Sequence, residues 1–114
     1  MELEGDLDVQ VPTDAGDGTV AFTFSVTNAG ADPIELQFSD ACKAEFVVRA
    51  DGQEVWRFTD GRMFAQVLGS DRLAPDETAT YDGEWSDPQP GSYTAVAELE
   101  AQNATCEART EFTV

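Results

Sequence analysis

The stretch Thr19-Val-Ala-Phe-Thr-Phe-Ser-Val-Thr27 decides the fold class, because its apolar residues occupy every second position. Val20, Phe22, Phe24 and Val26 form one face of an extended strand, and small or polar residues form the other. Shorter runs of the same kind recur at Leu7–Val11, Ile34–Phe38, Phe46–Val48, Val55–Phe58, Thr78–Trp85, Tyr93–Leu99 and Arg109–Val114. Turn clusters separate these runs about every ten residues, which predicts an all-β sandwich or barrel of roughly seven to nine strands.

The length and composition predict one domain that covers residues 1–114. A chain of 114 residues matches one domain by size, and its 41% of apolar residues is enough for one core. A chain of this size folds without a metal or a dense set of disulfides.

Two segments near the middle of the chain predict different local structures, a tight hairpin in one and a strand or loop in the other. Asp51-Gly52 stands between two strand-like runs and predicts a tight hairpin, in which both central residues have positive φ. In that hairpin Val55 and Trp56 point to opposite faces, and Phe58 shares the face of Trp56. Met63–Leu68 fits either a helical spacing or a strand with a bulge, and we favour a strand or an irregular loop.

The charge of the chain limits its partners. There are 23 acidic residues, six basic residues and a net charge of −17. Such a chain repels nucleic acids and anionic lipids, so we expect no nucleic-acid and no membrane partner. The acids alternate with apolar positions, which argues against disorder. Adaptation to molar salt explains this acidity, because salt screens the repulsion over about 3 Å at 1 M. An acidic mesophilic domain that meets a basic partner is the alternative.

The chemistry available to the chain argues against an enzyme. It has no histidine, which removes Ser–His and Cys–His pairs and histidine metal sites. With so many acids, neighbouring carboxylates arise by chance, and we interpret them as solvated surface charge. Asp6, Asp8, Asp14 and Asp17 lack the spacing of a calcium loop, and an Asx turn explains the last two. We expect no cofactor and no metal.

Cys42 and Cys106 are the only cysteines, and both fall on positions that face the core. Cys42 shares a strand face with Phe46 and Val48, and Cys106 shares one with Phe112. A disulfide between them would stabilise the fold by roughly 4 kcal/mol in the chain-entropy model. Two reduced, buried thiols, which suit a cytoplasm, are the alternative.

The N-terminus predicts a cytoplasmic protein. Met1–Asp8 carries four acids and no apolar stretch, unlike a signal peptide. Export of a longer precursor is the alternative. Asn103-Ala-Thr105 matches the acceptor pattern for N-glycosylation, but without a signal peptide we interpret it as an ordinary loop.

Two segments in the middle of the chain, Asp51-Gly-Gln-Glu-Val-Trp-Arg57 and Asp60-Gly-Arg-Met-Phe-Ala-Gln66, resemble the central signature of the BsuPI-type intracellular proteinase inhibitors. The resemblance extends in order and spacing over Thr19–Leu99, through Asn28, Phe38, Leu73–Glu77, Trp85 and Pro90–Tyr93. One departure is Asp76, where the family usually has glycine in a turn. The resemblance implies an immunoglobulin-like two-sheet antiparallel β-sandwich. From the acidic composition, we expect the chain to be a halophilic, archaeal member of the family.

The resemblance also implies inhibition of an intracellular subtilisin-like serine protease, and we expect the domain to be a monomer. The candidate protease-contact residues are Arg62, Met63, Phe64, Ala65 and Gln66, because an unbranched apolar side chain stands beside an aromatic one after a turn. A protease cleft binds such a segment in extended form. Packing of Met63 and Phe64 in the core next to Trp56 is the alternative. The second hypothesis for function is a β-sandwich interaction module without inhibitory activity.

Overall fold

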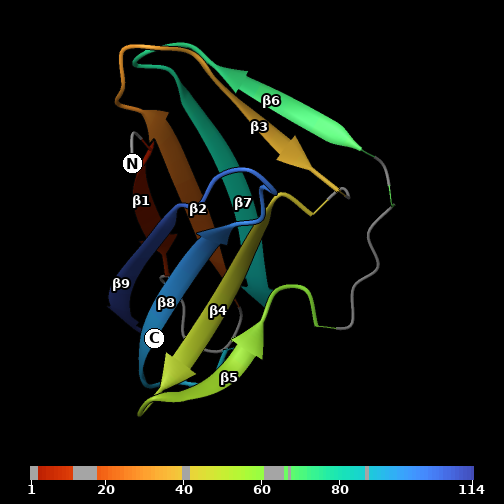
Figure 1. Ribbon diagram of the computed structural model, residues 1–114. Helices are drawn as coiled ribbons and strands as arrows, with labels where there is room; N and C mark the ends of the chain where they lie inside the picture. The colour runs from red at the N-terminus through yellow and green to blue at the C-terminus, as the bar shows by residue number, and fades with distance from the viewer. Residues whose placement is uncertain (1–2, 12–17, 40–41, 61–65, 67, 87) are drawn as a thin grey trace.

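The computed structural model describes residues 3–11, 18–39, 42–60, 66, 68–86 and 88–114, which form nine strands and no helix (Figure 1). The strands are β1 (Leu3–Gln10), β2 (Thr19–Asn28), β3 (Ile34–Phe38), β4 (Ala44–Ala50), β5 (Gln53–Arg57), β6 (Gly69–Leu73), β7 (Thr78–Ser86), β8 (Ser92–Leu99) and β9 (Glu107–Thr113). All the strand pairs are antiparallel. The predicted all-β class is confirmed.

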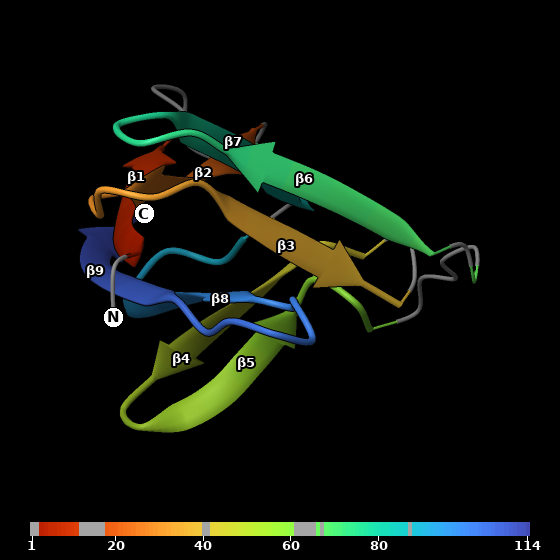
Figure 2. The ribbon, with the colours of Figure 1, turned by 45° about the horizontal axis from the view of Figure 1, so that its top comes forward.

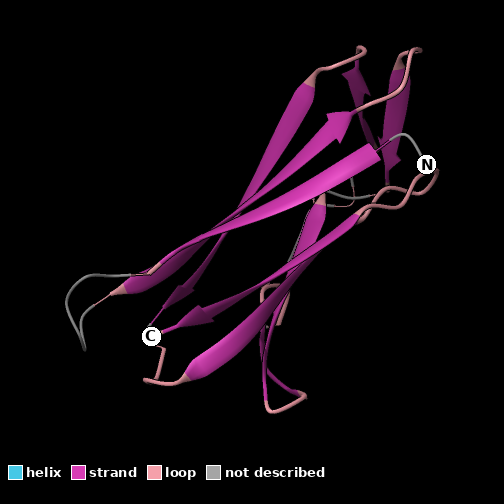
Figure 3. Cartoon of the chain, turned by 90° about the vertical axis from the view of Figure 1, so that its left-hand side faces the viewer, coloured by secondary structure: helices cyan, strands magenta, loops and turns pink. Residues whose placement is uncertain are grey.

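The strands form two facing layers and a two-stranded ribbon. One layer has the order β1-β2-β7 and the other has the order β5-β4-β8-β9 (Figure 2). The ribbon pairs β3 with β6 at the side of the two layers. A side view shows that strands and the loops between them make up the described chain (Figure 3).

The core lies between the two layers. On β2 the four alternating residues Val20, Phe22, Phe24 and Val26 are all fully buried. Burial of each such side chain stabilises the fold by about 1.5–3 kcal/mol relative to exposure. Phe46 from β4 packs across the sandwich against Gly83 of β7, where an added Cβ would lie 2.7 Å from the Phe46 ring. Glycine at this position therefore allows the two layers to approach.

An aromatic cluster joins the layers at one end. The Trp56 ring of β5 stacks on Phe22 at 5.7 Å and on Trp85 of β7 at 5.9 Å between centroids. Phe58 packs against Trp56 on the same side, whereas Val55 is 50% exposed. The predicted division of this hairpin into an inner and an outer face is confirmed.

The sequence located one turn correctly and missed one strand. Asp51 and Gly52 have φ values of 52° and 80°, as the predicted hairpin requires. Strand β6 was not predicted, because Gly69-Ser-Asp-Arg-Leu73 contains one apolar residue and shows no alternation. Within Met63–Leu68 only Gln66 and Leu68 are described, and neither belongs to a strand.

A buried asparagine organises the turns at the junction of the ribbon with the β1-β2-β7 layer. The Asn28 Nδ2 group donates hydrogen bonds to Asp32 O at 2.8 Å and to Leu73 O at 3.0 Å. Its Oδ1 atom accepts one from Gly30 N at 2.9 Å. Its backbone N–H and C=O groups bond to the turn at residues 74–77. Asn28 thus ties the β2–β3 connection to the β6–β7 connection.

The outer edge of β3 is covered by a loop rather than by another strand. Asn103 Oδ1 accepts a hydrogen bond from Gln37 N at 3.0 Å, and its Nδ2 donates one to Glu35 O at 2.6 Å. Gln102 N donates to Gln37 O at 2.7 Å. Asn103 therefore lies in a loop, as predicted, and its amide satisfies backbone groups that the edge would otherwise expose.

Candidate functional site

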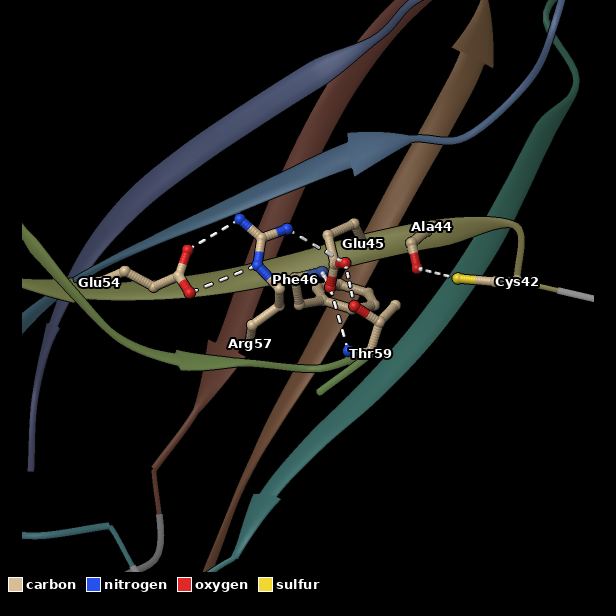
Figure 4. A network of polar contacts seen from close by, with 7 residues as sticks. All are labelled: Cys42, Ala44, Glu45, Phe46, Glu54, Arg57 and Thr59. Atoms are coloured by element: carbon tan, nitrogen blue, oxygen red, sulfur yellow. Dashed lines mark hydrogen bonds and ion pairs between the residues drawn. The ribbon is translucent and has the colours of Figure 1, made fainter. Parts of the chain in front are cut away.

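The described part of the chain buries one acidic side chain, Glu45 on β4, which is 7% exposed. Its Oε1 atom accepts hydrogen bonds from the backbone N–H groups of Phe46 at 3.0 Å and Thr59 at 3.3 Å. Its Oε2 atom accepts them from Thr59 Oγ1 at 2.5 Å and from Arg57 at 3.3 Å (Figure 4). Four donors thus compensate the buried charge, which would otherwise be strongly unfavourable.

This carboxylate lies where the chain leaves the sheet. The last backbone bond between β4 and the end of β5 joins Phe58 N to Phe46 O at 2.9 Å. The next N–H along the chain, that of Thr59, donates to the Glu45 side chain. Asp60 N then donates to Arg57 O at 3.1 Å, which closes a turn. Glu45 therefore holds the residues that immediately precede the candidate segment Arg62–Gln66.

Arg57 links Glu45 to the surface. Its guanidinium group is 41% exposed and donates to both carboxylate oxygens of Glu54, at 2.8 and 3.4 Å. This hydrogen bonding raises the pKa of Arg57 and lowers the pKa of Glu54 from their ordinary values. Both groups stay charged at neutral pH, so the charged chain Glu54–Arg57–Glu45 runs from solvent to the interior.

Four of the predicted contact residues, Arg62, Met63, Phe64 and Ala65, lie outside the described residues. The fifth, Gln66, is exposed. The described residues on either side of the segment, Asp60 and Leu68, are also exposed, and Leu68 is 81% exposed.

A second polar cluster ties the start of β4 to β6. Lys43 Nζ contacts both carboxylate oxygens of Asp71, at 3.1 and 3.2 Å, and lies 5.4 Å from the centre of the Phe38 ring. The Tyr81 hydroxyl donates to Asp71 at 3.2 Å. Burial, together with the Asp71 carboxylate, raises the pKa of Tyr81. Lys43 and Tyr81 are both engaged in holding Asp71, so we assign this cluster a structural role.

The two cysteines are not bonded to each other. Cys42 precedes β4 and its thiol donates to Ala44 O at 3.4 Å, while Cys106 precedes β9. Strand β8 lies between β4 and β9, which separates the two Cα atoms by roughly 10 Å, whereas a disulfide needs less than about 7 Å. Burial raises the pKa of the Cys106 thiol. The geometry favours the two reduced thiols over the bridge.

Sequence reasoning missed Glu45 and Thr59. An available indication was the run Ala44-Glu-Phe-Val-Val48, in which one acid interrupts five positions that are otherwise apolar. Among the described residues, no group of three or more Cys, Asp or Glu side chains gathers as a metal site would require. Within the same residues no helix is long and apolar enough to cross a membrane.

Comparisons with known proteins bear on the family and the fold. The family model for BsuPI, described as intracellular proteinase inhibitor, matches residues 3–104. A search of curated proteins found no match.

Two solved structures are similar in fold. The sporulation control protein Spo0M from Bacillus subtilis matches 100% of this chain and 49% of its own, with 14% identity and a TM-score of 0.60. The β-glucosidase EmGH1 from Erythrobacter marinus matches 97% of this chain and 15% of its own, with 13% identity and a TM-score of 0.54. The chain thus spans about half the length of Spo0M, and at these identities both structures show the fold alone.

Proposed function

The chain belongs to the BsuPI family of intracellular proteinase inhibitors, and from this premise we propose that it binds a subtilisin-like serine protease and blocks its cleft. The observation that carries the proposal is the match of the family model over residues 3–104, which includes strands from both layers. Members of an inhibitor family are generally not enzymes. We propose that this chain acts as a monomeric domain inside the cell.

We propose Arg62, Met63, Phe64, Ala65 and Gln66 as the residues that contact the protease. The segment follows the turn at Arg57–Asp60 and precedes β6, and its described neighbours are exposed. Met63 and Phe64 offer an unbranched apolar and an aromatic side chain to the pockets of a cleft that binds extended chains. A segment held in one conformation loses little entropy on binding.

The test is a titration of subtilisin with the purified protein, in salt at which it is folded. We expect stoichiometric inhibition, and we expect Met63→Asp and Phe64→Asp to abolish it, because a charge in an apolar pocket costs several kcal/mol. Val55→Asp, a matched change at an exposed apolar residue outside the segment, should leave inhibition intact.

The outcomes separate the hypotheses. If both segment variants fold and still inhibit, the contact residues lie elsewhere. If either change unfolds the protein, its side chain belongs to the core. If the wild type inhibits none of a panel of subtilisin-like proteases, the interaction module without inhibitory activity replaces this proposal.

We also propose that the protein comes from a halophilic, archaeal cell. Its net charge is −17, and Glu45 is the single buried acid among the described residues. The other described carboxylates crowd the surface and oppose compaction at low ionic strength. Raising potassium chloride from about 0.1 M to about 2 M should therefore increase the melting temperature substantially. An unchanged melting curve would contradict adaptation to salt.

A further inference from the structure

We propose that the free edge of strand β7 binds an extended segment of another protein, in which apolar residues alternate with lysine or arginine. The segment adds to β7 as a further strand, so that backbone hydrogen bonds provide affinity and alternate side chains provide specificity. This edge shares no residue with the segment proposed to contact the protease, so the site is independent of protease inhibition.

Strand β7 has the longest edge without a partner in the described part of the chain. It pairs with β2 along one side over all of its nine residues, and no described strand pairs with its other side. Beyond the bonds to β2, residues 78–86 make no backbone hydrogen bond to any other described residue. The free edges of β5 and β6 are only five residues long. A long open edge is a template for pairing with another chain.

The other long edges are closed by neighbouring parts of the molecule. Strands β1 and β9 lie against each other, and a Cβ added to Gly5 of β1 would lie 3.0 Å from Glu107 O of β9. The edge of β3 is satisfied by the loop at Gln102 and Asn103. Among the described strands, β7 is therefore the one that offers a long row of backbone groups to a partner.

A groove of about 360 Å³ opens beside this edge, between the middle of β7 and the start of β4. Its lining includes Thr80, Tyr81, Asp82, Lys43, Ala44 and Phe46. None of the described residues that line it comes from β2, so it lies on the side of β7 that β2 leaves free. Ala44 and Phe46 are buried and give the groove an apolar floor. Every second side chain of an added strand points toward this groove, where an apolar side chain is favoured.

The remaining side chains of the added strand lie on the outer face of the β1-β2-β7 layer, which is acidic. Asp82 and Glu84 of β7 are exposed on this face, and so are Glu4, Asp6 and Asp8 of β1. The three strands of the layer contain no lysine and no arginine. Side chains directly opposite one another on adjacent strands interact, and opposite charges stabilise the pair. Lysine or arginine on the partner strand therefore complements Asp82 and Glu84.

The same acids argue against a second copy of this chain as the partner. Two β7 edges brought together would face each other with Asp82 and Glu84 on both sides, and like charges at opposite positions are destabilising. Charged side chains on an open edge are a common protection against pairing between identical chains. The edge therefore favours a basic strand from a different protein.

The experiment measures how the whole protein binds a synthetic peptide as long as β7, in which valine alternates with lysine. Titration calorimetry gives the Kd at the lowest salt concentration at which the protein is fully folded. One control peptide has the same composition with the valines and lysines in two separate blocks, and a second alternates valine with glutamate. We expect the alternating basic peptide to bind at least about tenfold more tightly than either control, because it alone places apolar and basic side chains on opposite faces of a strand.

Two matched variants locate the peptide on the protein. Glu84→Lys and Glu4→Lys reverse one exposed charge each on the same outer face, the first on β7 and the second on β1, at the far side of β2. We expect Glu84→Lys to weaken binding about tenfold, because a cross-strand attraction becomes a repulsion. Glu4→Lys, with the same change in net charge, should alter the Kd by less than about twofold.

Hydrogen exchange of the β7 amides in the wild type provides a test that needs no variant. The N–H groups of alternate residues in 78–86 point away from β2, and the bound peptide should slow their exchange. Equal affinity for the alternating and block peptides, or equal losses in Glu84→Lys and Glu4→Lys, would overturn the site, because net charge alone would then explain binding. Absence of binding, or exchange at β7 that the peptide leaves unchanged, would overturn it as well.

Discussion

Asn28 and Glu45 are the two buried polar residues of the described core, and they support two different parts of the molecule. Asn28 is neutral and joins two connections within the frame of the sandwich, with carbonyl and amide partners. Glu45 is charged and holds the point where the chain leaves the sheet, with a guanidinium group that is partly exposed. Both sites satisfy all their hydrogen bonds, but one of them depends on charge.

The difference shows that a buried polar side chain can obtain its hydrogen-bond partners in two ways. A neutral amide is insensitive to ionic strength and to protonation near neutral pH. The Glu45 carboxylate is balanced by the charge of Arg57, which also contacts Glu54 at the surface, and salt screens such charges. We therefore expect the two junctions to differ in how salt affects them.

The largest expected effect is at Asn28. Asn28→Ala leaves the buried carbonyl of Leu73 without its partner, together with a carbonyl and an N–H in the partly buried β2–β3 connection, and should lower the free energy of unfolding by about 3 kcal/mol. Urea unfolding measures the loss. Asn103→Ala, at an exposed asparagine that also makes two bonds, should cost about 1 kcal/mol. Equal losses would show that burial does not distinguish the two sites.

Glu45→Ala should have a smaller effect that depends on salt. We expect a loss of about 2 kcal/mol at low ionic strength, because the N–H of Thr59 loses its acceptor and Arg57 keeps solvent contact. The loss should shrink at about 2 M potassium chloride, whereas that of Asn28→Ala should not. Glu84→Ala, at an exposed acid on β7, corrects for the removal of one negative charge. If salt changed the stability losses of Glu45→Ala and Asn28→Ala equally, the two junctions would not differ in their dependence on charge.

Acid should weaken the surface pair of Glu54 and Arg57. The hydrogen bond from Arg57 lowers the pKa of Glu54 below its ordinary value of 4.5, and the nearby charge of Arg49 acts in the same direction. A lowered pKa contributes stability above the ordinary value, and this contribution is lost as the pH falls through the value in the folded protein. The free energy of unfolding of the wild type should therefore decrease relative to that of Glu54→Gln as the pH falls below about 4, and urea unfolding at several pH values measures the difference.

An equal decrease in the wild type and in Glu54→Gln would mean that acid acts through other carboxylates. Glu54→Gln provides the matched control, because it removes the titrating group and keeps the shape of the side chain.

The smallest expected effect is at Asp76. Its φ of 66° is one that glycine adopts more easily, and its backbone N–H donates to Asn28 O at 2.8 Å. Asp76→Gly keeps that bond and should raise the free energy of unfolding by less than about 1 kcal/mol. A loss of stability would mean that the Asp76 side chain, and not only its backbone, supports the Asn28 junction.

The sequence allowed the frame to be predicted because its signals are local. Alternation in Val20–Val26 and the Asp51-Gly52 turn are properties of neighbouring residues, and both were confirmed. Strand β6 carries no such pattern, since its position depends on pairing with β3, more than thirty residues earlier in the chain.

The candidate site could be predicted only in part. The role of Glu45 depends on Thr59 and Arg57, which lie 14 and 12 residues away in the sequence. Its apolar neighbours are the one local feature that distinguishes Glu45 from the other acids among the 23. Asn28 was recognised as part of the resemblance to the family, but its burial and its partner Leu73 come from the tertiary structure. The contact role of Arg62–Gln66 stays a prediction.

Trp56 and Trp85 are the only tryptophans of the chain, and they come from opposite layers. Their rings stack at 5.9 Å with an angle of 26° between planes. Electronic transitions of two indoles at this distance couple, so circular dichroism should contain an exciton couplet that vanishes when the layers separate. The couplet therefore reports on the contact between the two sheets, and it should disappear when the sheets separate even where the strands within each sheet persist.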